Sequence, residues 1–154
     1  MLTLLIYSAL LTATAPPAGH SALRRAEVYN LASAIVDHHG QEDPWTLAAL
    51  AVKETRANTQ IVGKLGECGA MQVMGWHLRP ARSCKWLQTT DGSVKGAVIA
   101  MAQWREWAPA DVDPWGCYAA GTGCIHGHGQ EATARLFAIR AQMISGTRGA
   151  GLYR

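Results

Sequence analysis

The chain has 154 residues, the length of one domain, and its 49% apolar and 16% charged residues exclude an intrinsically disordered protein. Its net charge of +3 is small, and its basic residues are scattered, with Arg24-Arg25 as the only adjacent pair. A nucleic-acid-binding protein is therefore not expected.

The N-terminal segment differs from the rest of the chain. Residues 1–11 contain no charged side chain, and their apolar run of about ten residues is too short for a typical membrane span. The small residues at 13–15 follow it, which is typical of a signal peptide and its cleavage site. No basic residue precedes the run, so an N-terminal anchor or an ordinary buried helix stays open. We expect residues 1–22 to be a signal peptide or N-terminal apolar segment and residues 23–154 to form one exported domain.

Helical periodicity and capping residues organise the first half of that domain. Apolar residues recur at helical spacing over residues 22–38. Asp43 and Pro44 then predict a helix start, with the aspartate as N-cap and the proline in the first turn. This helix continues to about residue 57. Glycines break up residues 58–75, where we expect a loop with at most a short β-hairpin near residues 60–75.

The second half of the chain is also expected to be helical, with one interruption. A helix beginning near Ser93 carries apolar residues on one face. Pro109 and Pro114 bracket a break, and residues 116–129 are rich in glycine, so we expect turns there. A last helix covers about residues 130–144. No segment shows sustained alternation of apolar and polar residues, and the predicted fold class is mainly α.

The four cysteines, Cys68, Cys84, Cys117 and Cys124, are an even number. In a small exported protein this suggests two disulfides, and four cysteines allow three pairings. We expect the local pairing, Cys68–Cys84 and Cys117–Cys124, because it closes short loops.

The cysteines could also serve as zinc ligands or as the nucleophile of a hydrolase. Possible zinc ligands are clustered in one segment: Cys117, Cys124, His126 and His128. Their spacing matches no common zinc finger, and export favours a disulfide. A cysteine hydrolase would combine Cys68 or Cys117 with His77 or His126, yet nothing singles out one of the four thiols. We therefore expect neither a metal nor a cofactor.

Glu54 lies near the end of the apolar helix that begins at Pro44. Leu50 and Ala51 precede it by four and three positions, so Glu54 shares a helix face with apolar residues. Poor solvation favours the protonated form of a carboxyl group, and cleavage of a glycosidic bond needs an acid that is still protonated near neutral pH. On this helix alone, a solvated surface glutamate beside Lys53 or Arg56 is the ordinary alternative.

Two later segments complete a pattern with Glu54-Thr55. They are Gly66-Glu67-Cys68-Gly69-Ala70-Met71-Gln72-Val73-Met74 and Cys117-Tyr118-Ala119-Ala120-Gly121-Thr122-Gly123. In this order and spacing, the three blocks resemble the soluble lytic transglycosylases, a lysozyme-like superfamily. That family has a helix ending in Glu-Ser, then Gly-x-x-Gly-Leu-Met-Gln-Val/Ile, then Tyr-Asn-Ala-Gly-x-Gly. The resemblance covers residues 44 to about 124.

The chain departs from the family pattern at three positions. Thr55 replaces serine and keeps a hydroxyl group. Ala70 replaces leucine and opens space. Ala119 replaces asparagine and removes a polar group near the cleft, which puts the details of substrate contact in question.

The resemblance implies a goose-type, lysozyme-like domain with Glu54 as its single catalytic acid and base. The reaction would cleave the bond between N-acetylmuramic acid and N-acetylglucosamine in peptidoglycan and form a 1,6-anhydro product, so no second carboxylate is required. Gln72 and the backbone around Met71 would bind polar groups of the sugar, with Thr55 beside them. Tyr118 would lie close to Glu54 and orient it by hydrogen bonding.

Two alternatives stay open within the same fold. Glu67 could act as a second carboxylate at the substrate and permit hydrolysis, as in a muramidase, or be a loop residue. Ala119 motivates a non-catalytic glycan-binding or structural member. The expected partners are the glycan strands of peptidoglycan, acted on by a monomer that is periplasmic, secreted or virion-associated. By analogy, so small a domain fits local wall opening for a secretion, conjugation or phage assembly.

Overall fold

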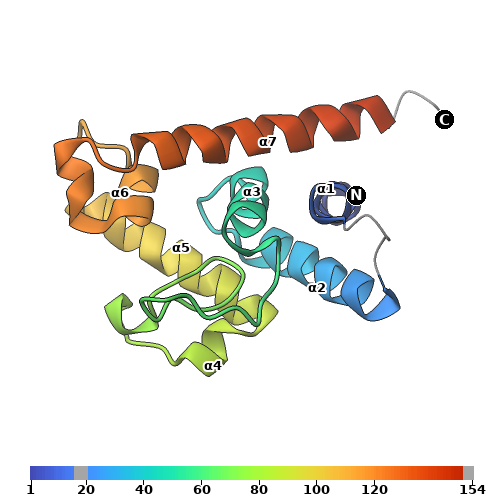
Figure 1. Ribbon diagram of the computed structural model, residues 1–154, viewed down its shortest axis with the longest axis horizontal. Helices are drawn as coiled ribbons and strands as arrows, with labels where there is room; N and C mark the ends of the chain where they lie inside the picture. The colour runs from blue at the N-terminus through green and yellow to red at the C-terminus, as the bar shows by residue number, and fades with distance from the viewer. Residues whose placement is uncertain (16–20, 151–154) are drawn as a thin grey trace.

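The computed structural model describes residues 1–15 and 21–150 (Figure 1), and over these residues the fold is mainly α, as predicted. The helices, in chain order, are α1 (Leu2–Thr14), α2 (Ala22–His38), α3 (Pro44–Thr55), η1 (Gly75–His77), α4 (Cys84–Leu87), α5 (Thr90–Trp107), α6 (Pro114–Ala120), η2 (Gly121–His126) and α7 (Gln130–Ala150).

Helix α3 begins where the sequence predicted. The Asp43 carboxylate accepts a hydrogen bond from the Thr46 amide at 3.0 Å, and Pro44 occupies the first turn. Such a cap satisfies an amide that has no partner inside the helix. Arg140 of α7 also donates to Asp43, at 2.6 Å, so the start of α3 is tied to the last helix.

The segment expected to consist of turns, residues 116–129, is largely helical instead. Asp113 and Pro114 repeat the start signal of α3, and Asp113 accepts a hydrogen bond from the Trp115 amide at 3.0 Å. Helix α6 and the 3₁₀ helix η2 follow from this start. The glycine content suggested turns, but the cap and the proline outweigh it.

The core lies between α1, α2, α3, α5 and α7. Helix α1 packs on α2, α3 and α7, while α2 packs on α5 and α3 packs on α7. In Figure 1, α7 runs along one side of the molecule and α4 lies on the opposite side, with α3 between them. The side chains with no exposed area include Ile6, Leu10, Leu31, Ile35 and Leu47.

The N-terminal apolar segment therefore contributes to this core. Ile6 and Leu10 of α1 are both fully buried, the arrangement of an ordinary buried helix. The cleavage region of the expected signal peptide falls mostly within residues 16–20, outside the described residues. Among the helices described, none combines the length and the hydropathy needed to cross a membrane.

The expected β-hairpin near residues 60–75 is reduced to two isolated antiparallel bridges among the described residues. These bridges join Val62 to Cys68 and Cys68 to Val73. Gly66 and Gly69 have φ angles of 91° and 80°, the left-handed region that glycine adopts without strain. Turns so close together leave no room for a longer strand.

The predicted disulfide pairing is confirmed. Cys68 of the loop is bonded to Cys84 of α4, and Cys117 of α6 is bonded to Cys124 of η2, with Cα–Cα distances of 5.4 and 4.8 Å. No cysteine thiol is free, which removes the cysteine hydrolase alternative. Two disulfides indicate an oxidising compartment.

Removing either disulfide should destabilise the protein. The Cys68–Cys84 bond spans 16 residues and the Cys117–Cys124 bond spans 7. On the loop-entropy model we expect losses in the free energy of unfolding of about 3 kcal/mol for the first and about 2.5 kcal/mol for the second. Urea denaturation of the two paired Cys→Ser variants measures both. Titration of four free thiols in the unreduced, unfolded protein would contradict the pairing.

Candidate active site

Glu54 lies in the last turn of α3, next to the buried face of that helix. Leu50 and Ala51 are buried, and 24% of the Glu54 side chain is exposed. The neighbouring ammonium group of Lys53 forms an ion pair with the Glu54 carboxylate at 2.5 Å. Glu54 is thus half-buried and held by one cation, while part of it faces solvent.

A strained turn directly follows Glu54-Thr55. Arg56 and Ala57 both have positive φ angles, 55° and 60°, although neither is a glycine. Residues in this conformation cost of order 1–3 kcal/mol each and persist only where their surroundings hold them.

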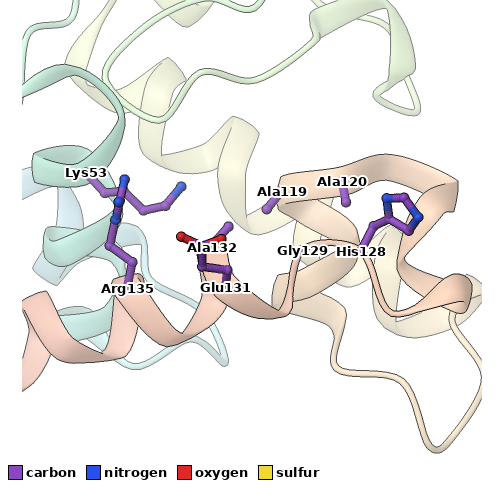
Figure 2. A pocket seen from close by; sticks show the side chains of 8 residues that line it. All are labelled: Lys53, Ala119, Ala120, His128, Gly129, Glu131, Ala132 and Arg135. Carbon is purple, nitrogen blue, oxygen red and sulfur yellow. The ribbon is translucent and has the colours of Figure 1, made fainter.

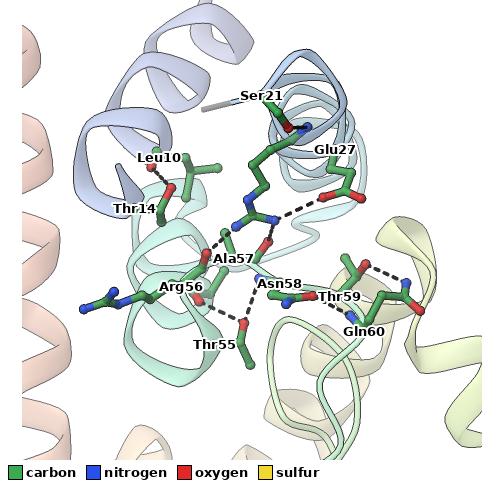
Figure 3. Close-up of polar contacts among 12 residues, drawn as sticks. Leu10, Thr14, Ser21, Glu27, Thr55, Arg56, Ala57, Asn58, Thr59 and Gln60 are labelled. Atoms are coloured by element: carbon green, nitrogen blue, oxygen red, sulfur yellow. Dashed lines mark hydrogen bonds and ion pairs between the residues drawn. The ribbon is translucent and has the colours of Figure 1, made fainter. Parts of the chain in front are cut away.

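Arg24 of α2 holds this turn. Its guanidinium donates hydrogen bonds to the carbonyl oxygens of Arg56 at 2.5 Å and Ala57 at 3.0 Å, the two carbonyls at the centre of Figure 3. The sequence carries no signal for this role, because Arg24 precedes the turn by more than thirty residues and only the fold brings them together.

Thr55 connects the end of α3 to the glycine-rich loop. Its hydroxyl lies 3.0 Å from the Ala70 carbonyl oxygen and 3.3 Å from that of Ala51, and it accepts a hydrogen bond from the Asn58 amide at 3.0 Å. The hydroxyl is therefore used in positioning the loop. The substrate contact predicted for Thr55 stays a prediction.

Tyr118 of α6 contacts Met71, the residue that follows Ala70 in the glycine-rich loop. Its hydroxyl donates to the Met71 carbonyl oxygen at 2.7 Å, and the Met71 side chain is fully buried. A phenol has one proton, so the expected donation from Tyr118 to Glu54 is replaced by this bond. Burial, with the Glu54 carboxylate as a second cause, raises the pKa of Tyr118 well above 10.0. The two side chains are thus close enough to interact electrostatically.

The raised pKa of Tyr118 predicts a loss of stability in alkali. In the unfolded chain a tyrosine ionises near pH 10, whereas Tyr118 in the folded protein keeps its proton. Tyr118 therefore contributes fully to the free energy of unfolding below that pH, and this contribution is lost as the pH rises. The free energy of unfolding should fall above about pH 10. Urea denaturation between about pH 8 and pH 11 measures the slope. Tyr118→Phe should show a shallower decline, and equal slopes would assign the effect to other groups.

Gln72 and Glu67 lie together on the loop. The Gln72 side-chain amide donates to the Gly69 carbonyl at 2.9 Å, and the Glu67 carboxylate accepts from the Leu65 amide at 2.9 Å. A Cβ atom on Gly63 would meet the ends of both side chains, which shows that they lie on the same side of the loop. Gln72 itself has a φ angle of 50°. Glu67 thus has the contacts of a loop residue.

A pocket of about 440 Å³ is lined in part by Lys53, the ion-pair partner of Glu54 (Figure 2). Its lining comes from α3, α6, the turn between η2 and α7, and the start of α7: Lys53, Ala119, Ala120, His128, Gly129, Glu131, Ala132 and Arg135. Ala119, which stands where the pattern that the sequence resembles has asparagine, also lies here. The α7 residues lie outside the three blocks, and no sequence signal pointed to them.

A metal centre finds no support in the part of the chain that the structure describes. No group of three or more His, Cys, Asp or Glu side chains is placed to hold an ion there. Cys117 and Cys124 are bonded to each other, so neither offers a thiolate to zinc.

Comparisons with known proteins return no relative. No protein-family model, no curated protein and no solved structure matches the chain.

Proposed function

We propose that the chain is a peptidoglycan lytic transglycosylase with a lysozyme-like fold, in which Glu54 is the general acid and base. The proposal starts from the three sequence blocks, since the comparisons offer no relative. It is supported by where those blocks lie in the folded chain.

The observation that carries the proposal is the meeting of the three blocks at one place. Thr55 at the end of α3 contacts the Ala70 carbonyl at 3.0 Å, and Tyr118 of α6 binds the adjacent Met71 carbonyl at 2.7 Å. The Glu54 carboxylate acts electrostatically on Tyr118. Segments separated by 15 and 47 residues are therefore held around one carboxyl group.

The proposed reaction needs one acid and no water. The Glu54 carboxyl group gives its proton to the oxygen that links C1 of N-acetylmuramic acid to N-acetylglucosamine, and the C1–O bond breaks. The acetamido group of the muramic acid assists at C1. Its C6 hydroxyl then bonds to C1, and the Glu54 carboxylate takes the hydroxyl proton. Because the nucleophile is part of the substrate, one carboxyl group performs both proton transfers.

The other residues position this acid. Arg24 and Thr55 hold the turn and the loop next to Glu54, while Tyr118 holds the loop at Met71. The Lys53 ammonium group donates to one oxygen of the Glu54 carboxylate at 2.5 Å. Its side chain has to move aside before that oxygen can reach a glycosidic oxygen. Positioning of this kind lowers the barrier because less freedom is lost at the moment of reaction.

Digestion of purified sacculi tests the proposal. Mass spectrometry of the soluble products should show 1,6-anhydro-muropeptides. Reducing muramic acid ends would instead identify a hydrolytic muramidase, and binding to sacculi without soluble products would identify a glycan-binding protein. Either of those results would overturn the transglycosylase proposal.

A further inference from the structure

The pocket lined in part by Lys53 contains charged groups that the proposed reaction does not use. Arg135 and His128 are exposed, and among the described residues neither side chain takes part in an ion pair or hydrogen bond. In Figure 2, Lys53 and Arg135 lie on one side of the pocket, His128 lies on the other, and Glu131 lies between them. Small residues form much of the remaining lining: Ala119, Ala120, Gly129 and Ala132.

Lys53 belongs to this pocket and to the site at once. Its ammonium group pairs with Glu54 at 2.5 Å, while its side chain lines the pocket. With Glu54 included, two cations and two carboxylates belong to this region, and among the described residues Arg135 has no ion-pair partner. An anion that entered the pocket would give Arg135 a partner and would compete with Glu54 for Lys53.

We propose that this pocket binds a carboxylate of the substrate and thereby draws Lys53 away from Glu54. The inference rests on the proposed function and adds to it a recognition element on α7. A guanidinium binds a planar carboxylate through two parallel hydrogen bonds. Glu131 disfavours a doubly charged anion such as a phosphate by repulsion. His128 supplies a further hydrogen-bonding group on the opposite wall.

The glycan strand offers this chemistry from two sources. One is the lactyl carboxylate of muramic acid without a peptide, and the other is a carboxylate of the stem peptide. The position of the pocket suits either source, because Lys53 directly precedes the acid that acts on the same sugar. A bound carboxylate would leave the Glu54 oxygen free when the correct substrate is in place, so recognition and catalysis would be coupled.

Three tetrasaccharide probes of alternating N-acetylglucosamine and N-acetylmuramic acid test this inference. The first carries free lactyl carboxylates, the second carries their methylamides, and the third carries stem tripeptides. We expect the wild-type kcat/KM to be about tenfold or more higher for a carboxylate-bearing probe than for the methylamide, the size typical of a charged hydrogen bond. The probe that shows the preference identifies the source. Equal values for all three would overturn the inference.

Removing a positive or a negative charge from the pocket should change the carboxylate preference in opposite directions. Arg135→Gln should bring the preference to within about twofold, chiefly through kcat, because Lys53 is no longer drawn from Glu54. Glu131→Gln should increase the preference. Lys95→Gln removes a charge from α5, outside the pocket, and should change nothing. Because Arg135 is exposed, its variant should keep the wild-type thermal midpoint. A preference that survives in Arg135→Gln would contradict the proposal.

Equilibrium binding separates this inference from the proposed function. Isothermal titration calorimetry of the same probes needs no turnover. Selective binding of a carboxylate probe that is lost in Arg135→Gln, without cleavage of any probe, would support the pocket and reject the transglycosylase. Cleavage of all probes at equal rates would retain the transglycosylase and reject the pocket. Equal binding of all probes without cleavage would reject both.

Discussion

Replacing Glu54 with glutamine should reduce the turnover of peptidoglycan by about 10²–10⁴-fold or more, because the amide cannot give up a proton as a carboxyl group does. The side chain keeps nearly the same shape. Only the ion pair with Lys53 is lost, and 24% of the Glu54 side chain is exposed to solvent. The free energy of unfolding should therefore change little. Release of soluble muropeptides from sacculi measures the turnover, and the thermal midpoint reports on the fold.

Glu67→Gln is the matched control for this substitution. It changes the other carboxylate near the glycine-rich loop, which accepts a hydrogen bond from the Leu65 amide at 2.9 Å. As a loop residue, Glu67 should tolerate the amide with at most a few-fold loss of turnover, since an amide oxygen still accepts that bond. Near wild-type turnover in Glu54→Gln would show that another residue is the acid. Equal losses in the two variants would favour the two-carboxylate, hydrolytic alternative.

Replacing Arg105 with methionine should destabilise the protein about as much as losing the Cys68–Cys84 disulfide. Glu42 lies between α2 and α3, only 3% of its side chain is exposed, and Arg105 of α5 binds both of its carboxylate oxygens. The hydrogen bond to Glu42 raises the pKa of Arg105 above its ordinary value. Removing the arginine leaves a buried carboxylate without its cation. We expect the free energy of unfolding to fall by about 3 kcal/mol. This value is at the lower end of the range for breaking a buried ion pair, because Arg105 is itself partly exposed.

The double variant Glu42→Gln/Arg105→Met distinguishes the cause of this loss. Neutralising the carboxylate removes the unpaired charge, so the double variant should recover at least half of the free energy lost in Arg105→Met. Urea denaturation at neutral pH measures all three proteins. No recovery in the double variant would assign the loss to packing of the arginine side chain instead.

Local signals in the sequence were sufficient for much of the fold. Asp43 and Pro44 predicted the start of α3 because capping depends on residues within one turn. The same signal at Asp113 and Pro114 predicts α6, but the glycines that follow obscured it. Of the short hairpin expected at most near residues 60–75, two isolated antiparallel bridges are present among the described residues. The glycines of this segment marked a loop correctly, while their positive φ angles, which decide how the loop turns, depend on what surrounds it.

The candidate site also has features that local sequence patterns predict and features that depend on tertiary packing. The three blocks and the cysteine pairs are short patterns in which side-chain chemistry and spacing are informative, so the sequence suffices to predict Glu54, Tyr118 and the two disulfides. Three features depended on packing between distant segments: Arg24 at the turn after Glu54, the hydroxyl of Tyr118 on the Met71 carbonyl, and the α7 side of the pocket. Hydrogen bonds and pockets require atoms to be close in space. The separation of two residues along the chain does not predict whether their atoms are close. Short-range patterns therefore predict the candidate residues, whereas the groups that surround these residues follow from the packing of distant segments.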